Sequence, residues 1–190
     1  LARPLMACAL LSDTAIVCGA AVSGYRGGGK AMISKHDAGD LHPAFSYGTN
    51  LQHKHLGEMT LYSGLKTPPI FMPSVGDFYA GMLVHMPLHA DQIDGSATAA
   101  MIYDCLADWY DGSALVRMAA AAANHADVPP MLAADALAGR NDMELFVFSD
   151  ATEQRFWLTA RLDNLGKGAS GAAVQNMNIA LGLDDHFGLS

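Results

Sequence analysis

The sequence is short of charged residues, and of basic ones above all. Only 16% of its 190 residues are charged, and 19 Asp and Glu against 11 Lys and Arg give a formal net charge of −8 at pH 7. An acidic chain without a basic stripe is not expected to bind nucleic acid non-specifically. Hydrophobic residues make up 51% of the chain, which at this length is enough for one sizeable core.

Cysteine is also scarce: the chain holds Cys8, Cys18 and Cys105, with no closely spaced pair. A structural zinc site is therefore not expected. An odd number of unevenly spaced cysteines is more typical of a protein from a reducing compartment than of a disulfide framework. We therefore expect a cytoplasmic protein. All three thiols stand in apolar surroundings of the sequence, so we expect buried, inert cysteines rather than an activated nucleophile.

No apolar run is long enough for a membrane span. The first 22 residues are apolar, but Ser12 and Asp13 interrupt them, and neither a basic segment nor an initiating Met precedes them. We expect a short helix to about Leu11, a turn and a buried strand over residues 15–22. Because there is no starting Met, we expect the chain to begin inside a larger protein.

Strand and helix signals alternate without a strict βαβ rhythm, which predicts an α+β fold. "TPPIFMPSVG" should be extended, "GMLVHMPLHA" should form a strand with an edge or bulge at Pro87, and "MELFVFSD" and "RFWLTARLD" should form a hairpin. A helix is expected in "SATAAMIYDCLADWYDG", capped by Ser96 and ended by Gly112. A last helix, closed by Gly182, is expected, with one face marked by Ala173, Val174, Met177, Ala180 and Leu181. The stretch "AAAAANHADVPP" is ambiguous.

The stretch "SGYRGGGKA" follows the first predicted strand. Gly24, Gly29 and Lys30 match the spacing of a nucleotide P-loop, but Ala31 replaces the Ser or Thr that would hold magnesium. A plain glycine-rich turn is one alternative. We prefer a loop whose backbone amides, with Arg26 or Lys30, hold an anionic substrate.

The stretch "HKHLGE" brings two histidines and a carboxylate together, at His53, His55 and Glu58. Two histidines in a strand with one residue between them would face the same way and could bind a metal, with His85 and His89 as spare ligands. A surface cluster is another alternative. We favour acid–base chemistry beside a nucleophile, because imidazole titrates near neutral pH.

The run "DNLGKGASGAAVQN" places Gly166, Gly168 and Gly171 around a helix start. Free amides and the helix dipole at such a place suit an anion or a polar cofactor group. The same glycines would also suit a close-packed helix entry.

Taken together, these motifs resemble the N-acetyl-γ-glutamyl-phosphate reductase family, in its shorter form. The resemblance covers nearly the whole chain through six co-linear blocks: "LARPL", "AVSGYRGGGK", "LQHKHLGEM", "PIFMPSVGDFYAGMLVHMPLH", "GRNDMELFVF" and "ARLDNLGKGASGAAVQNMNIALGL". Aspartate-semialdehyde dehydrogenase shares a run like the last block. The "HKHLGEM" block favours the reductase.

The resemblance implies a fold and a domain division. The fold is the α+β domain of glyceraldehyde-3-phosphate-dehydrogenase-like enzymes, with a mixed, largely antiparallel sheet. Residues 1–14 would be a remnant of the NADP-binding Rossmann domain, 15–162 the catalytic and dimerisation domain, and 163–190 a helix that returns to the Rossmann domain. The sheet would face a partner subunit, in a homodimer or homotetramer.

The resemblance also implies a mechanism. A cysteine thiolate attacks N-acetyl-γ-glutamyl phosphate, and NADPH reduces the thioacyl enzyme to the semialdehyde, a step of arginine biosynthesis. The family's nucleophile segment lies just before the block like "LARPL" and is not in this chain, so the chain alone should be inactive. His55 would be the acid–base group with Glu58 orienting it, and His53 would contact substrate. The division between the two histidines stays open, and Gly57 replaces the family's usual Pro.

Two further groups of site residues follow from the resemblance. Ser23, Gly24 and Lys30 would bind the acyl phosphate or the α-carboxylate. Asn164, Lys167 and Gly168 would lie against the nicotinamide side of the cofactor, and no metal is expected. The alternatives are a fragment of aspartate-semialdehyde dehydrogenase and a non-catalytic dimerisation domain.

Overall fold

The computed structural model describes residues 1–120 and 131–189, so most of the ambiguous "AAAAANHADVPP" stretch lies outside it. The helices and strands follow in the order α1 (Ala2–Ala7), β1 (Cys18–Gly24), α2 (Gly29–Asp37), β2 (Ala44–Ser46), α3 (Leu56–Ser63), β3 (Ile70–Gly76), β4 (Met82–His89), α4 (Ala99–Trp109), β5 (Val116–Met118), β6 (Met143–Ser149), β7 (Arg155–Leu162) and α5 (Gly171–Ala180). A 3₁₀ turn (Tyr25–Gly28) precedes α2, and a π-helical turn (Gly166–Ser170) precedes α5.

The strands form one seven-stranded sheet in the order β2-β3-β1-β4-β7-β6-β5. The β1–β3 and β5–β6 pairs are parallel, and the other four pairs are antiparallel. The expected α+β fold with a mixed, largely antiparallel sheet is confirmed.

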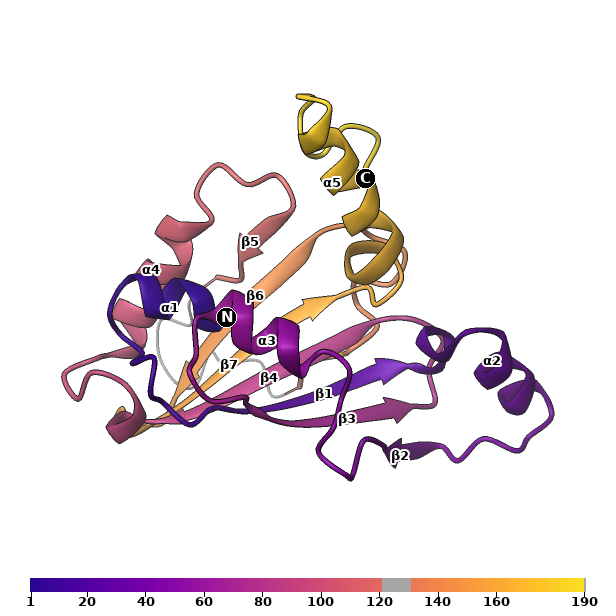
Figure 1. Ribbon diagram of the computed structural model, residues 1–190, viewed down its shortest axis with the longest axis horizontal. Helices are drawn as coiled ribbons and strands as arrows, with labels where there is room; N and C mark the ends of the chain where they lie inside the picture. Colours follow the sequence, from indigo (N-terminus) through magenta and orange to yellow (C-terminus); the bar gives the residue numbers. More distant parts are fainter. Residues whose placement is uncertain (121–130, 190) are drawn as a thin grey trace.

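One face of the sheet carries the core, beneath α1, α3 and α4 (Figure 1). Alternate residues of β4 and β7 point to this face because side chains alternate along a strand. Leu5 of α1 and Ile102 and Leu106 of α4 are fully buried against it. The sheet residues of this core are Met86, Leu88, Leu145, Phe156, Leu158 and Ala160.

The opposite face, which we call the open face, leaves large side chains exposed near its centre. The register places Met72 of β3, His85 of β4 and Trp157 of β7 on it. Met72 is 48% exposed and Trp157 is 47% exposed. The Trp157 indole N–H donates to Nδ1 of His85 at 3.1 Å, and the two rings lie 5.3 Å apart.

The strand predictions for β3, β4 and the β6–β7 hairpin are confirmed. Pro87 pairs with Trp157 but lies beyond the stretch of β4 that pairs with β1, so it sits at a local edge as expected. The helix at 99–109 is confirmed too, but its cap is Thr98, whose hydroxyl accepts a 3.2 Å bond from the Met101 amide. Ser96 instead donates to Asp94.

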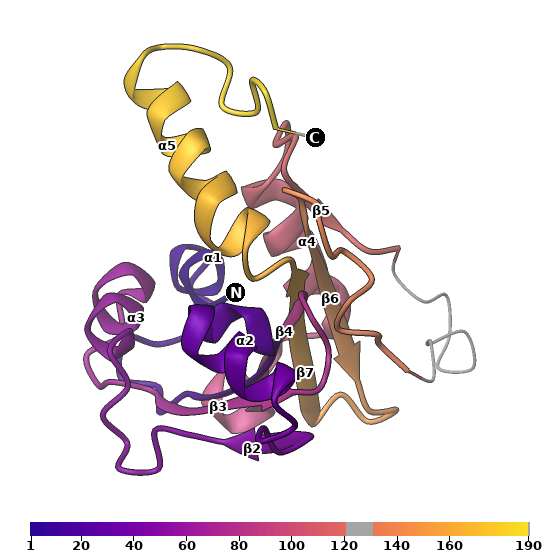
Figure 2. The ribbon, with the colours of Figure 1, turned by 90° about the vertical axis from the view of Figure 1, so that its right-hand side faces the viewer.

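Two helices were not predicted. Helices α2 and α3 contain no buried residue, so they show no apolar stripe. The last helix forms as expected, and Gly182 follows it with a φ of 70°; Met177 and Leu181, on the face that the apolar spacing marks, are 52% and 66% exposed. Helix α5 projects beyond the end of the sheet, as Figure 2 shows, so little of the described chain covers it.

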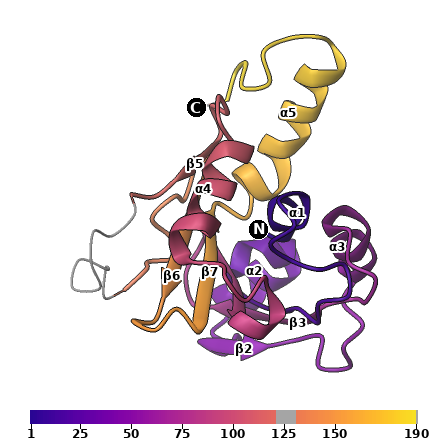
Figure 3. The same cartoon turned by 90° about the vertical axis from the view of Figure 1, so that its left-hand side faces the viewer.

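The expectation of three buried, unpaired cysteines was also wrong. Cys8 is exposed and is joined to Cys105 of α4 by a disulfide that spans 97 positions. The bridge ties α1 to α4, which lie next to each other in Figure 3. Cys18, in β1, is the free thiol of the described residues.

Candidate functional site

The end of β1 leads into the glycine-rich loop (Gly24–Lys30), which lies along the turn between β3 and β4. The amide of Gly24 donates to Gly81 at 3.0 Å, and that of Tyr25 donates to Phe78 at 2.9 Å. Gly24 is buried, and a Cβ there would come within 2.7 Å of the Tyr79 and Ala80 backbones. Only glycine fits, because the two backbones approach so closely.

Asn164 joins this loop to the other end of the chain. Its side-chain Nδ2 donates to the Gly24 carbonyl at 3.2 Å, and its Oδ1 accepts from the Gly81 amide at 3.0 Å. A Cβ on Gly27 would come within 2.7 Å of the same amide group. The structure therefore brings a residue expected at the substrate and a residue expected at the cofactor into direct contact.

Asp163 organises the turn that presents Asn164, and it was not among the residues singled out from the sequence. Asp163 is 3% exposed. Its Oδ1 accepts from the Leu165 and Gly166 amides at 2.7 and 3.2 Å, and its Oδ2 accepts from the Gly139 amide. A buried carboxylate with three backbone donors fixes both segments at once. An aspartate directly before Asn in "DNLGKG" was the available signal.

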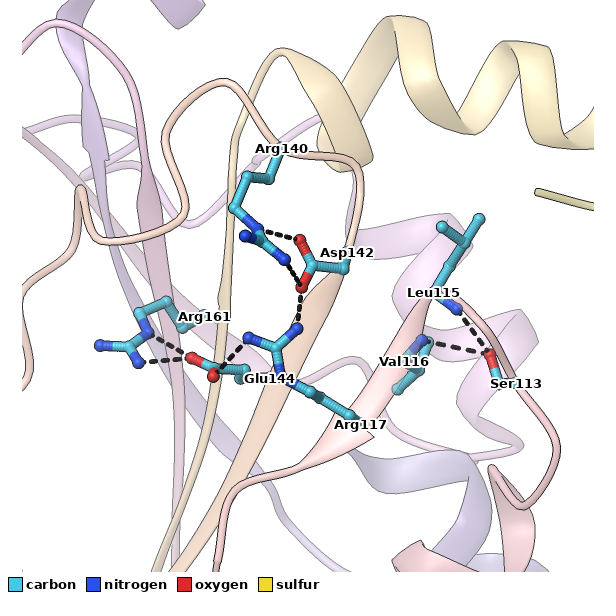
Figure 4. Close-up of polar contacts among 8 residues, drawn as sticks. All are labelled: Ser113, Leu115, Val116, Arg117, Arg140, Asp142, Glu144 and Arg161. Atoms are coloured by element: carbon cyan, nitrogen blue, oxygen red, sulfur yellow. Dashed lines mark hydrogen bonds and ion pairs between the residues drawn. The ribbon is translucent and has the colours of Figure 1, made fainter. Parts of the chain in front are cut away.

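An ion-pair network adjoins this turn, on the open face and at the strand ends (Figure 4). Arg161 of β7 and Arg117 of β5 both bind Glu144 of β6, and Arg117 also binds Asp142. Arg140 completes the network through bonds of 2.7 and 3.0 Å to Asp142. Burial alone would raise the pKa of Glu144, but hydrogen bonds and charge from Arg161 and Arg117 outweigh it and lower that pKa.

The other expected ligand residues take different positions. Ser23 is half-buried in β1, and Lys30 is exposed in the first turn of α2. Nζ of Lys167 donates to Gln175 at 2.5 Å, and burial lowers the Lys167 pKa, partly offset by Asp185. Gly168 lies in the π-helical turn, and its amide donates to the Asp163 carbonyl at 2.8 Å.

His53 is the better fixed of the two histidines. Its ring lies 5.1 Å from Phe71, 5.7 Å from Tyr47 and 4.9 Å from His55, between ring centres. Its Nδ1 is 3.3 Å from the His55 amide and accepts from it, so neutral His53 carries its proton on Nε2. Burial, and then the charges of His55 and Lys54, lower the His53 pKa.

His55 and Glu58 are both exposed, at the start of α3. His55 occupies the N-cap position of the helix without a side-chain capping bond, and Glu58 stands in the first turn. Within residues 1–120 and 131–189, no hydrogen bond or ion pair joins Glu58 to His55. The strand geometry considered for a metal site is absent here, because residues 54–55 form a turn. No three His, Cys, Asp or Glu side chains of the described chain group as metal ligands.

The histidine segment and Ser23 share the core face of the sheet. Phe71, against which His53 packs, pairs with Gly19 of β1, and Gly19, Ala21 and Ser23 point the same way. In the part of the chain that the structure describes, no hydrogen bond or ring contact links His53 to the glycine-rich loop. The structure thus unites the Gly24 and Asn164 groups and leaves the His53 group separate on the same face.

The fold defined by this sheet is that of semialdehyde dehydrogenases. It is similar to the crystal structure of aspartate semialdehyde dehydrogenase II from Vibrio cholerae, with a TM-score of 0.64 and 15% identity over 94% of this chain and 57% of that one. The enzyme from Francisella tularensis matches with the same TM-score, at 14% identity over 94% and 60% of the two chains. At such identities the likeness concerns the fold alone.

The family follows from the sequence. Residues 1–164 match the model of the semialdehyde dehydrogenase dimerisation domain, and the chain belongs to that family. It is 42% identical to N-acetyl-gamma-glutamyl-phosphate reductase from Trichormus variabilis, over 98% of this chain and 61% of that protein. The same-named protein from Rhizobium rhizogenes is 45% identical over 95% and 59%. The chain thus spans about three fifths of these relatives. No helix of the described residues is long and apolar enough to cross a membrane.

Proposed function

We propose that this chain is the substrate-binding and dimerisation part of an NADP-dependent reductase that converts N-acetyl-γ-glutamyl phosphate to N-acetyl-glutamate semialdehyde. The proposal draws its substrate from the relatives' names. The observation that carries it is the Asn164 bridge between Gly24 and Gly81, because it sets the expected substrate loop against the expected cofactor turn. Such a reductase serves arginine biosynthesis in the cytoplasm.

The glycine-rich loop supplies the anion site in this proposal. Ser23 and Lys30 lie on either side of a tight turn whose shape Gly24 makes possible. Lys30 is an exposed ammonium in the first turn of α2, where the helix dipole also favours an anion. These residues would bind the acyl phosphate or the α-carboxylate and orient the carbonyl carbon.

The histidine group supplies proton transfer. We assign His55 to the acid–base role, with Glu58 reaching it once substrate is bound, and His53 to a substrate contact. The His53 Nε2–H, fixed by the bond at Nδ1, suits a donor to a substrate oxygen. A reductase of this kind also needs a thiolate. Cys8 and Cys105 are paired and Cys18 lies in a strand, so the thiolate must come from the part of such an enzyme that this chain does not cover.

In this proposal, the turn at 163–168 lies against one side of a nicotinamide cofactor. The cofactor would supply the hydride. Asn164 uses Oδ1 and one Nδ2 hydrogen within the chain, which leaves the second Nδ2 hydrogen for a ligand. Lys167 is held by Gln175 rather than by a carboxylate, so its charge is available to an anionic group. Gly168 keeps this surface free of a side chain.

We assign the domain boundaries as 1–14, 15–162 and 163–190. The exposed apolar side chains of the last segment, including Met177, Ile179 and Leu181, support its docking on a separate cofactor domain. The first segment packs against the main core of this chain, because Leu5 and Leu11 belong to that core. The open face of the sheet, with Met72 and Trp157, would pair two copies in a homodimer, or in a homotetramer built from such dimers.

The test is an enzyme assembled from this chain and the amino-terminal part of the Trichormus variabilis relative that the chain does not match. We expect NADPH oxidation with N-acetyl-γ-glutamyl phosphate and much slower oxidation with β-aspartyl phosphate. The reverse preference would favour the aspartate-semialdehyde alternative. A correctly folded assembly inactive with both, while the intact relative turns over in the same assay, would favour a non-catalytic dimerisation domain.

A further inference from the structure

We propose that His36 is a positioning residue that holds the glycine-rich loop and α2 in the arrangement that binds the acyl phosphate. It acts through Tyr25 and Asp77. This inference rests on the proposed function of the loop as the substrate site, and it adds a residue that neither the motifs nor the resemblance single out.

His36 touches both sides of the loop. It lies in the last turn of α2, and its Nε2 is 3.1 Å from Oδ1 of Asp77, in the turn between β3 and β4. Its ring stacks on the ring of Tyr25, with centres 3.9 Å apart and planes 12° from parallel. Tyr25 begins the 3₁₀ turn that leads into α2. One imidazole therefore connects the entry of the loop, the end of α2 and the neighbouring turn.

The entry of the loop has further support that α2 lacks. The amides of Tyr25 and Arg26 donate to Phe78 and Tyr79, and the Arg26 guanidinium lies 4.7 Å from the centre of the Tyr79 ring. These contacts fix the first residues of the loop to the β3–β4 turn. They do not reach the helix that follows.

Helix α2 has no fully buried residue, and only Met32 and Ile33 of its apolar side chains are half-buried, so hydrophobic burial holds it weakly. Apart from the His36–Asp77 bond, no hydrogen bond or ion pair of the described residues joins an α2 side chain to a residue outside the helix and its flanking turns. Lys30 stands in the first turn of this same helix. The direction of the Lys30 ammonium therefore depends on the contact that His36 makes at the other end.

The contact is too exposed to contribute much to global stability. The side chains of His36 and Asp77 are 33% and 55% exposed. Solvent-exposed pairs of this kind contribute little to the free energy of unfolding. Its effect should appear in the local order of α2 and in substrate affinity. A residue with a purely structural role would instead change the unfolding midpoint.

The first test uses the 190-residue chain and measures hydrogen–deuterium exchange by mass spectrometry. His36→Ala should speed exchange in the peptide covering α2 by about tenfold, the loss expected for one net hydrogen bond, with an unchanged unfolding midpoint. Asp77→Ala should do the same. His186→Ala is the matched control, because His186 also faces an aspartate, its neighbour Asp185 at 3.4 Å, but lies far along the chain from the loop. Unchanged exchange in α2 for His36→Ala would overturn the proposal.

The second test uses the assembled enzyme. His36→Ala should raise KM for the acyl phosphate by about tenfold while kcat stays within about twofold, because the residue orients a binding loop and touches no reacting atom. His36→Phe keeps the stack on Tyr25 and loses the bond to Asp77, so it should lie between wild type and His36→Ala. An unchanged KM, or a fall in kcat alone, would contradict the positioning role.

The two tests separate this inference from the proposed function. If the assembled enzyme does not turn over even with wild-type His36, the proposed function fails, and the exchange measurement still shows whether His36 orders α2. If the enzyme is active and His36→Ala behaves like wild type in both measurements, the proposed function stands and the inference about His36 is wrong.

Discussion

Asn164 and Gly24 are 140 positions apart in the chain, yet the Asn164 side chain donates a 3.2 Å hydrogen bond to the Gly24 carbonyl. The same side chain accepts from Gly81. Two loops that carry different parts of the proposed chemistry are therefore held by one amide. Loss of this amide should disturb both loops together.

We expect Asn164→Ala to destabilise the chain by about 1–3 kcal/mol, because the Gly24 carbonyl and the Gly81 amide lose a shared partner in a partly buried place. Urea unfolding followed by circular dichroism measures this. Asn176→Ala is the control, since Asn176 is exposed on α5. Equal stability of the two variants would show that the bridge is dispensable.

Stability should depend on pH through His53 and His85. Burial is the largest cause that lowers the pKa of each. As pH falls, these histidines therefore take up protons in the unfolded chain before they do so in the folded one. The free energy of unfolding should decrease from about pH 7 to about pH 5 and level off below the folded-state pKa values of the two histidines. Urea unfolding at several pH values measures the slope.

Two variants identify the source of this slope. His53→Phe and His85→Phe should each flatten it, and the double variant should flatten it further. His42→Phe is the control, because His42 is exposed. Carboxylates with lowered pKa, such as Asp94 and Asp185, also contribute to the free energy of unfolding. They lose this contribution only below about pH 5, so they do not affect the slope between about pH 7 and pH 5. A slope in the double variant as steep as that of the wild type would contradict the assignment. A smaller residual slope is expected from the Leu1 amino group, because burial lowers its pKa to about 6.

Among the acidic residues of the open face, Glu144 should be the one whose replacement lowers the free energy of unfolding most. It accepts from Arg161 and Arg117 with its side chain only 14% exposed, so Glu144→Gln leaves Arg161 without its counter-charge and leaves Arg117 with Asp142 alone. We expect a loss of about 1–3 kcal/mol in urea unfolding. Asp104→Asn, an exposed acid on α4, should cost less than about 0.5 kcal/mol.

Trp157 should be a main contact between two copies of the chain. Trp157 on the open face and Trp109 on α4 are 47% and 46% exposed, so exposure does not distinguish them. If the open face forms the dimer, Trp157→Ser should weaken the dimer at least tenfold, and Trp109→Ser should leave it unchanged. Sedimentation velocity over a range of concentrations measures both. A monomer at every concentration for the wild type would contradict the proposed homodimer.

The Cys8–Cys105 bridge should stabilise the oxidised chain. It closes a loop of 97 positions, for which chain entropy predicts a contribution of up to about 4.7 kcal/mol. Reduction should lower the midpoint of thermal unfolding in the wild type. Cys8→Ser should unfold at the reduced midpoint with or without reductant, while Cys18→Ser should keep the difference. Non-reducing peptide mapping would identify the pair directly.

The parts of the fold that the sequence predicted are those with a dense apolar pattern. Strands β3, β4, β6 and β7 are rich in apolar and aromatic residues, and helix α4 places apolar residues on one buried face at helical spacing. Both patterns are visible in the sequence. Helices α2 and α3 contain no buried residue, so no apolar periodicity in the sequence predicts them. Their existence depends on local glycine turns and on contacts with distant segments.

The candidate site was predictable in its residue types and not in its contacts. Gly24 and Asn164 stood in distinctive runs, but a sequence does not tell that one binds the other. Asp163 was missed because a lone aspartate beside a glycine turn has many possible roles. The pairing of Cys8 with Cys105 was missed for the same reason, since a set of three cysteines does not specify its partners.

The strand order divides the molecule into two consecutive halves of the polypeptide. Strands β1–β4 build one side of the sheet and β5–β7 build the other, and they meet along the single seam between β4 and β7. The first half can therefore pair its strands during synthesis before the second half exists, and the seam closes last. Separate expression of the two halves should thus allow them to reassemble along this one strand pair.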